Sequence, residues 1–333
     1  MYYYPEIISG LNERLISIIN KPNHRHFSVF IKNSYLFHQT PLLNMKNILV
    51  PTDFSQCSAN AYNYATMLAE HTGATIHLFY ALDISFNSGD SQGTRGDVQF
   101  MMQLLKLTKA RMNKLRKGSA FKNFKVNEVV VMGSLTEKIT EIIRKNKIDM
   151  VVMGTHGTSG MQQSFVGSNS EKVVRNADIP VLTVRDAVKN PMIKKIIFAT
   201  DFSYETKIVL RSICAIAEMF DAELILAKVV TQNDFETTHE TELQIEDLRK
   251  KSKMFNYSTK IYYAHSREQG IRNMADTLGA DIIAVGTHGR HGLARLFQGS
   301  VAERVVNHSS LPVLTINFHK KLLAAQKAKN NNR

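Results

Sequence analysis

Continuous apolar runs alternate with segments of helical spacing along most of this chain. Residues 129–131 and 282–285, for example, are unbroken apolar stretches. Runs without polar alternation are typical of strands that are buried on both faces of a sheet. Strands that alternate with helices indicate parallel pairing through right-handed crossovers. The pattern therefore predicts an α/β fold with helices on both faces of parallel sheets.

The alternation predicts five strands in each half of the chain. In the first half we expect them near 47–52, 74–81, 125–131, 149–154 and 180–185. In the second half we expect them near 195–200, 223–230, 258–264, 281–286 and 312–317.

The two halves are copies of one another. Residues 46–55 reappear as 194–203, and residues 179–184 reappear as 311–316. Units of about 140 residues have the size of domains, so the repeat is a duplicated domain rather than a solenoid. We expect domains at 45–188 and 192–318, followed by a basic tail at 319–333.

Residues 1–44 have no counterpart in the second half. Ile8, Leu11, Leu15 and Ile19 have the spacing of a short amphipathic helix. Two readings stay open: a misassigned or disordered extension ahead of a natural start at Met45, or an arm that binds a partner.

The first copy is also longer between its first strand and its glycine motif. The excess best fits 83–97, which is rich in Ser, Gly, Asn and Asp and reads as a loop. Such a loop is either a lid over the sheet edge or an idle insertion.

A glycine motif occurs once in each copy, directly after the fourth strand. Gly154 and Gly157 precede Gly167-Ser168 by a nine-residue spacer, and Gly286 and Gly289 precede Gly299-Ser300 in the same way. A strand, a glycine loop and a helix N-terminus form a cradle for phosphate. The serines also match a capping box with Glu171 and Glu303, so capping is the alternative role.

Two further residue types accompany each motif. Asp53 and Asp201 follow the first strand of each copy, at the edge where ligands of open parallel sheets bind. Each carboxylate either accepts hydrogen bonds from a nucleoside or caps the next helix. His156 and His288 lie within the glycine loops, but no second histidine or carboxylate is placed to form a metal site or proton relay. Walker A and dinucleotide-binding patterns are lacking, and no catalytic residue is assigned.

Composition narrows the class of protein only a little. The net charge is +13, but five of the basic residues lie in the tail from Lys320 to Arg333. That tail reads as a solvated end, with a polyanion contact as the alternative, so no specific nucleic acid is expected. No apolar run of about 18 residues occurs, so no membrane partner is expected. With two cysteines, Cys57 and Cys214, and no signal segment, the expected location is the cytoplasm.

These motifs resemble the universal stress protein family in its tandem, ATP-binding form. The markers are the Pro-Thr-Asp-Phe-Ser segment at 51–55, the doubled glycine motif and the closing Pro-Val-Leu-Thr-Val strand at 180–184. The resemblance spans residues 45 to about 317. It implies that each half is a Rossmann-like domain with a five-stranded parallel sheet.

The resemblance also implies a nucleotide site in each half, with Mg²⁺ accompanying ATP. In the first half its residues are Pro51, Thr52 and Asp53 near the nucleoside, Ala81 against adenine, Met153 and Gly154 beside the ribose and phosphates, and Gly157, Gly167 and Ser168 on the phosphates. The matching residues of the second half are Ala199, Thr200, Asp201, Val229, Val285, Gly286, Gly289, Gly299 and Ser300.

The halves depart from one another at several of these places. Pro51 becomes Ala199, and Gly133 corresponds to His265, which either crowds the site or alters a turn. Ser168 is followed by polar Asn169 and Ser170, whereas Val301 and Ala302 follow Ser300. Two outcomes stay open: occupancy of both sites, or unequal occupancy of the two.

The expected function is a cytoplasmic stress-response protein that signals through ATP-dependent conformational change without enzymatic turnover. The alternatives are a slow ATPase or phosphate-transfer enzyme that uses His156 or His288, and a nucleotide-free interaction scaffold. The family resemblance implies that the two closing strands pair within the chain. A protein partner and a homodimer are further expectations.

Overall fold

The structure is a computed structural model that describes residues 45–83, 95–155, 168–188, 191–234, 237–251, 256–287 and 300–318. The expected helix near Ile8 and the basic tail lie outside these residues. The strands of the first half are β1 (Asn47–Pro51), β2 (Thr75–Leu82), β3 (Val126–Met132), β4 (Met150–Gly154) and β5 (Val181–Val184). Those of the second half are β6 (Lys195–Ala199), β7 (Glu223–Val230), β8 (Ser258–Tyr263), β9 (Ile282–Thr287) and β10 (Val313–Asn317).

The helices follow the strands in the predicted alternation. The first half contains α3 (Gln56–Thr72), α4 (Arg95–Arg116), α5 (Leu135–Lys145) and α6 (Ser168–Asn176). The second half contains α7 (Tyr204–Met219), α8 (Thr238–Lys251), α9 (Arg267–Leu278) and α10 (Val301–His308).

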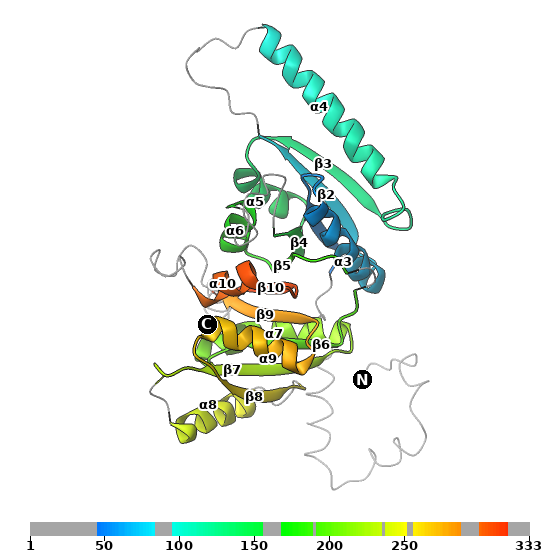
Figure 1. Cartoon of the computed structure of the whole chain (residues 1–333). Coiled ribbons are helices and arrows are strands. Elements are labelled where there is room, and N and C mark those ends of the chain that lie inside the picture. Colours follow the sequence, from blue (N-terminus) through cyan, green and yellow to red (C-terminus); the bar gives the residue numbers. More distant parts are fainter. Residues whose placement is uncertain are drawn as a thin grey trace, which may run out of the picture. The chain divides into compact units, whose positions relative to one another are not determined.

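All ten strands belong to one sheet in the order β3-β2-β1-β4-β5-β10-β9-β6-β7-β8 (Figure 1). Within each half every strand pair among the described residues is parallel, as the apolar runs predict. The strand order reverses between β1 and β4 in the first half, and between β6 and β9 in the second. Open parallel sheets bind ligands at such a switch point, at the carboxyl ends of the strands.

Each half has a core between its sheet and two helices. In the first half Leu49 and Val151 pack with Ile139 of α5 and Val173 of α6. The second core has the same construction from β6, β9, α9 and α10. Because the opposite face of the sheet is covered as well, side chains of both orientations are buried along the central strands, which accounts for their unbroken apolar sequence.

In both halves an aspartate forms the same hydrogen bonds at the amino ends of two neighbouring strands. Asp149 Oδ2 accepts hydrogen bonds from the backbone N–H groups of Lys46 and Asn47, at 2.7 and 2.9 Å. Asp281 Oδ2 accepts from the N–H groups of Lys194 and Lys195 at the same two distances. Each carboxylate thereby ties the loop before one strand to the start of its neighbour.

The halves join through an antiparallel pairing of β5 with β10. Leu182 lies opposite Leu314, its counterpart in the repeat, so a pseudo-two-fold axis passes between them. The buried hydroxyl of Thr183 donates to the carbonyl of Val313 at 3.1 Å, and that of Thr315 donates to the carbonyl of Val181 at 3.2 Å. The intramolecular pairing implied by the family resemblance is therefore present.

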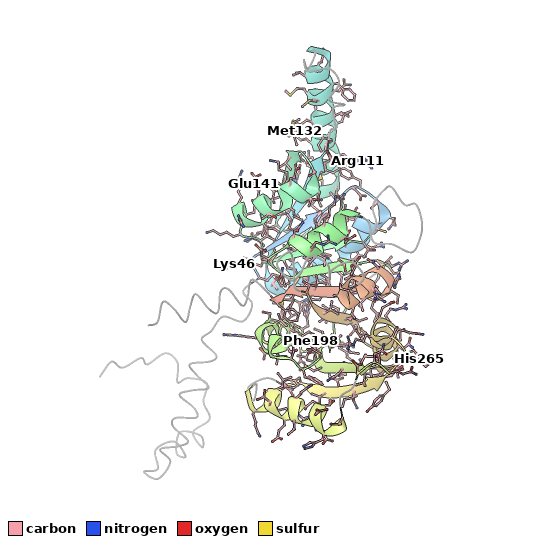
Figure 2. The ribbon with its side chains drawn as sticks, turned by 90° about the vertical axis from the view of Figure 1, so that its left-hand side faces the viewer. Lys46, Arg111, Met132, Glu141, Phe198 and His265 are labelled. Atoms are coloured by element: carbon pink, nitrogen blue, oxygen red, sulfur yellow. The ribbon has the colours of Figure 1, made fainter. Side chains whose placement is uncertain are left out.

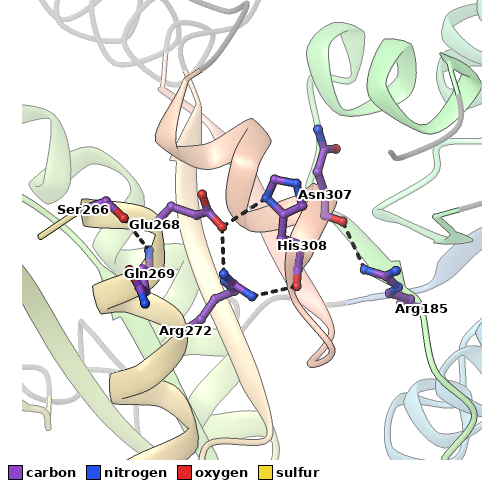
Figure 3. Close-up of polar contacts among 7 residues, drawn as sticks. All are labelled: Arg185, Ser266, Glu268, Gln269, Arg272, Asn307 and His308. Atoms are coloured by element: carbon purple, nitrogen blue, oxygen red, sulfur yellow. Dashed lines mark hydrogen bonds and ion pairs between the residues drawn. The ribbon is translucent and has the colours of Figure 1, made fainter. Parts of the chain in front are cut away.

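A second link between the halves involves the end of α10 (Figure 3). Arg185, just after β5, donates from Nη1 to the carbonyl oxygen of Asn307 at 3.2 Å. Arg272 of α9 donates to the next carbonyl, that of His308, and Glu268 contacts both Arg272 and the His308 ring. Cationic side chains thus satisfy carbonyl groups that the helix end leaves without an intrahelical donor.

The extra length of the first copy is in part helical, which corrects the loop reading of 83–97. Helix α4 already begins at Arg95 and has 22 residues, against 14 in α8. Residues 84–94 lie outside the described residues, so the lid reading stays a prediction. The apolar and Met-rich residues after Asp97 extend the helix, although the preceding composition suggests a loop.

Candidate functional site

The exit of β1 is held by the hydroxyl group of Thr52. Thr52 is buried, and its N–H donates to the carbonyl oxygen of Phe79 at 2.9 Å, which continues the pairing with β2. Its Oγ1 accepts from the N–H of Phe54 at 3.0 Å, and contacts the hydroxyl groups of Ser58 and Tyr62. Thr52 therefore has a structural role, because its hydrogen bonds fix the turn that follows β1.

Asp53 stands in the turn that connects β1 to α3. Its Oδ1 accepts from the N–H of Ser55 at 3.0 Å, while Phe54 adopts a left-handed φ of 62°. Ser55 is the cap of α3, with its hydroxyl accepting from the N–H of Ser58. Capping therefore belongs to Ser55, and Asp53 forms the turn that places its carboxylate at the switch point.

The second half repeats this exit with one difference. Asp201 Oδ1 accepts from the N–H of Ser203 at 2.9 Å, and Phe202 has a φ of 60°. Thr200 Oγ1 accepts from the N–H of Phe202 and contacts the hydroxyl of Thr206. Ser203 precedes α7, but its side chain makes no cap hydrogen bond. A non-glycine residue at positive φ costs free energy, and both copies retain it, so the bend is a shared requirement.

Gly154 is required by packing at the end of β4. A Cβ at this position would stand 2.6 Å from the backbone carbonyl of Cys57 and 3.0 Å from the N–H nitrogen of Ser58. The first turn of α3 therefore lies directly against the strand end. The carbonyl of Gly154 accepts from the buried hydroxyl of Ser170 at 2.8 Å, which ties α6 to the same point. The sequence singled out Ser170 only as a departure between the halves.

Gly286, the counterpart of Gly154, has a different neighbour. A Cβ at Gly286 would clash with the ring of Phe318, which follows β10. Phe318 is buried. The two glycines thus end equivalent strands but make room for helix backbone in one half and for an aromatic ring in the other.

The phosphate side of each predicted cradle is described only in part. Helix α6 begins at Ser168. Ser300 is the cap of α10, and its hydroxyl accepts from the N–H of Glu303 at 3.1 Å. A hydroxyl that accepts in this way still has its own proton to donate, so capping and anion binding are compatible. The remaining loop residues, His156, Gly157, Gly167, His288, Gly289 and Gly299, lie outside the described residues.

Several predicted ligand residues direct their side chains into the cores. Met153 and Val285 belong to the two core clusters and are almost fully buried. Val229 is also a core residue, and its Cγ1 would stand 2.5 Å from a Cβ on Gly270 of α9. Ala81 packs against the first core. At these positions a ligand at the sheet edge would meet main-chain atoms. Pro51 is buried, and Ala199 is half-buried.

The difference between Gly133 and His265 is a change of turn. Gly133 has a φ of 114°, which side-chain-bearing residues rarely adopt. His265 is exposed and is not among the residues with positive φ, so its backbone follows another path (Figure 2). The backbone therefore supports the altered turn, and crowding of a ligand by the His265 ring stays a prediction.

An aromatic and cationic stack borders the first site, and the sequence did not point to it. The rings of Phe54 and Tyr80 are stacked with their centroids 5.1 Å apart, and the guanidinium carbon of Arg111 lies 4.1 Å from the Phe54 centroid. Arg111 comes from α4 (Figure 2). The second half has Lys228 in place of Tyr80, and its Phe202 is buried. This cluster could not be predicted from the sequence, because Arg111 is 57 positions from Phe54.

Burial governs the titration of the tyrosine beside Thr52. Desolvation raises the pKa of the Tyr62 phenol, against the lowering effect of its hydrogen bonds with Ser58 and Thr52. The Tyr62 phenol is therefore neutral near pH 7. Among the described residues no group of three or more His, Cys, Asp or Glu side chains is placed to hold a metal ion. No helix in the described part of the chain has the length and apolarity needed to cross a membrane.

Comparison with known proteins identifies the class. The sequence model of the universal stress protein family matches residues 44–185 and 192–317. This chain belongs to the universal stress protein family.

Its relatives include both tandem and single-domain proteins. Universal stress protein Slr1230 of Synechocystis is 28% identical over 291 residues, which cover 81% of this chain and 99% of that protein. Universal stress protein MJ0531 of Methanocaldococcus jannaschii is 31% identical over 145 residues, which cover 43% of this chain and 84% of that protein.

A solved structure supports the fold across both halves. The crystal structure of a universal stress protein from Archaeoglobus fulgidus has a TM-score of 0.61 and covers 83% of this chain and 98% of its own. Its sequence identity is 19%, so this likeness concerns the fold alone.

Proposed function

We propose that this protein binds ATP at the carboxyl edge of its sheet and signals stress through a nucleotide-dependent change of conformation, without enzymatic turnover. The observation that carries the proposal is the convergence at the first switch point. The turn of Asp53 follows β1, and Gly154 ends the neighbouring strand β4. Helix α6, which begins at Ser168, is tied to Gly154 by the hydroxyl of Ser170. An acceptor for a nucleoside and a helix N-terminus for phosphate would then lie at the same edge of the sheet.

Each predicted site residue has a physical role in this proposal. The carboxylate of Asp53 accepts from a ribose or base, and the main chain of Met153 and Gly154 flanks the ribose. Helix α6 offers its first N–H groups and the Ser168 hydroxyl to phosphate. Thr52 and Pro51 hold the exit in place. Gly157 and Gly167 complete the cradle.

The second half offers the same groups. Asp201 corresponds to Asp53, and Ser300 at the cap of α10 corresponds to Ser168. Ala199, Thr200, Val229, Val285, Gly286, Gly289 and Gly299 complete this second proposed site.

Mg²⁺ would accompany the triphosphate rather than occupy a protein cage. Such an ion is bound chiefly by phosphate oxygens and water. The cytoplasm is the location that we propose. The conformational change would be read by a protein partner, and a homodimer through other surfaces belongs to the same proposal.

Titration calorimetry with ATP and Mg²⁺ on the full chain tests the proposal. The panel includes ADP, AMP and cAMP, the nucleotide with which one solved universal stress protein is described. We expect ATP to bind, and the variant Asp53→Ala to weaken binding to the first half roughly 10- to 100-fold through loss of a charged acceptor. Asp53→Asn retains an oxygen for the Ser55 N–H and should lose less. Asp186→Ala, an exposed aspartate after β5, is the control.

Two results would overturn the proposal. If the wild-type protein binds no nucleotide, the alternative of a nucleotide-free interaction scaffold is favoured. Steady ATP hydrolysis that disappears in a His156→Ala, His288→Ala double variant would favour the enzyme reading instead.

A further inference from the structure

The first turns of α4 expose large apolar side chains to solvent. Val98, Phe100, Met102 and Leu107 are each more than half exposed. No residue from 98 to 111 is buried, whereas the next residue of the helix is. Figure 1 and Figure 2 show the start of α4 standing clear of the sheet, while its later turns lie along β2 and β3. A contiguous group of this kind marks a contact surface.

These side chains belong to an apolar surface that covers most of the circumference of the helix. Seven of the ten residues from 98 to 107 are apolar. At about 100° per residue they span an arc of about 220°, and Gln99, Gln103 and Lys106 occupy the remaining side. A helix that packs on one protein surface needs an apolar stripe of about 100°. The wider arc favours an environment that surrounds the helix on several sides.

The same helix opens a strongly cationic segment. Residues 98–127 contain eight lysine and arginine residues and no aspartate or glutamate. This charge of +8 and the +5 of residues 320–333 together equal the net charge of +13, so the rest of the chain is neutral overall. Seven of the eight side chains are exposed, and the eighth, Arg116, is partly buried and pairs with Glu128 at 2.6 Å. The segment therefore attracts anionic partners.

The equivalent helix of the second half has neither property. In α8 the acidic residues Glu240, Glu242, Glu246 and Asp247 accompany the basic residues Arg249, Lys250 and Lys251. Leu243 is the one exposed large apolar side chain among the described residues of α8. A folding role shared by the two halves therefore does not explain the apolar start and the cationic remainder of α4.

The combination of apolar and cationic surface discriminates between anionic partners. The phosphates of a nucleic acid would match the cations but would leave the apolar arc in water. A groove on an acidic protein would cover one face of the helix and leave the rest of the arc exposed. An anionic lipid surface matches both features, because acyl chains surround the apolar arc while the headgroups lie beside the cations.

We infer that α4 binds anionic lipid membranes, with the apolar arc of residues 98–107 among the acyl chains and the following cations at the headgroups. This departs from the sequence-based expectation of no membrane partner, which rested on the lack of a spanning run. A helix that lies in the plane of the interface requires no such run. The inference goes beyond the proposed function and does not depend on nucleotide binding.

The cationic part of the inference is tested by cosedimentation of the full-length chain with phosphatidylcholine vesicles, with and without phosphatidylserine. We expect binding to the anionic vesicles, weakened by salt. Each cation beside an anionic surface contributes roughly fivefold, so the triple variant should lose roughly 100-fold in partitioning. That variant is Lys106→Gln, Lys109→Gln and Lys114→Gln. The control, with the same net charge, is Arg144→Gln, Lys145→Gln and Lys260→Gln, three exposed cations elsewhere that should matter little.

The apolar arc is tested with a fluorescent reporter that the chain otherwise lacks. Because the sequence contains no tryptophan, Phe100→Trp places a single one on the arc. Anionic vesicles should shift its emission to the blue, and brominated lipids should quench it. Leu243→Trp on α8 is the matched control and should show neither response. Met102→Ser with Leu107→Ser should weaken partitioning roughly tenfold. All these positions are exposed, and circular dichroism establishes that each variant is folded.

Several results would overturn the inference while leaving the proposed ATP binding intact. They include no binding to anionic vesicles, equal binding to neutral ones, and unchanged binding by the triple variant of α4, which would assign binding to the basic tail. Binding without a response of the tryptophan at position 100 would mean adhesion through charge alone. Binding to RNA or polyglutamate but not to vesicles would assign the cations to another polyanion.

Discussion

The amino and carboxyl edges of the sheet have changed to different extents since the duplication. At the amino edge Asp149 and Asp281 make the same two backbone contacts at the same distances. At the carboxyl edge Gly154 and Gly286 have unlike neighbours. The hydrogen bonds that hold the starts of neighbouring strands together are thus the same in both halves. The carboxyl edge, where we propose that a ligand binds, differs between them.

Paired changes at the carboxyl edge show that the second half was repacked rather than loosened. Ala81 and Lys138 of the first half correspond to Val229 and Gly270 of the second, and the larger Val229 packs against Gly270. Volume gained on the strand is offset by volume lost on the helix, which close-packed interiors require. A difference in function can therefore arise without loss of the fold.

The largest expected effect is a difference between two glycine substitutions. Gly154→Ala forces the backbone of α3 away from β4 and should lower the free energy of unfolding by about 3 kcal/mol. Gly286→Ala meets a side chain that can rotate, so its loss should be smaller. Combining Gly286→Ala with Phe318→Ala should cost less than the sum of the single variants. Urea unfolding measures all four, and additive losses would show that the ring and Gly286 are not coupled.

Substitution of the amino-edge aspartates should, in contrast, affect both halves alike. Asp149→Ala and Asp281→Ala each remove an ionised acceptor of two backbone N–H groups, and each should cost about 2 kcal/mol. Denaturant unfolding of the two variants side by side is the measurement. A loss confined to one half would contradict the equivalence of this edge.

Thr183 and Thr315 make equivalent contacts on the two sides of the pseudo-two-fold axis. Thr183→Val and Thr315→Val keep the shape of the side chain but remove a buried donor to a carbonyl of the other half. Each should cost about 1 kcal/mol, and the two should be equal because the contacts are related by the pseudo-two-fold axis. Thermal unfolding measures the pair, and an unequal response would show that the symmetry is only geometric.

The smallest effect concerns His77, a buried residue of β2 at a position where the second half has isoleucine. Burial lowers the pKa of His77 from its ordinary value of 6.5, and Nε2 contacts Oδ1 of Asn47 at 3.0 Å. The unfolded chain therefore binds the proton more readily, so stability present above pH 6.5 is lost as the pH falls. The slope is at most about 1.4 kcal/mol per pH unit.

The second half supplies the control for this pH dependence. Ile225 occupies the position that corresponds to His77. In His77→Ile the acid-side slope of the unfolding free energy should flatten between pH 6.5 and 5. An unchanged slope would assign it to other groups.

The strands could be predicted from the sequence because their burial requires continuous runs of apolar residues, which are visible locally. β7, for instance, spans Glu223–Val230, as the apolar run predicts. The contact of Phe318 with Gly286 and that of Arg111 with Phe54 leave no such signal, since each joins distant residues through the direction of a side chain. The sequence predicts Asp53 and Ser300 as site positions, but it does not show that the side chains of Met153 and Val285 turn into the cores.

The antiparallel pairing of β5 with β10 has a consequence for how this chain can vary. In a symmetric dimer of separate chains, a substitution appears in both partners at once. Here the two halves are covalently joined, so each meets the other at a high effective concentration even when one of them changes. A residue such as Phe318 can therefore arise in one copy alone, and the molecule can combine one unaltered strand end with one that has been modified.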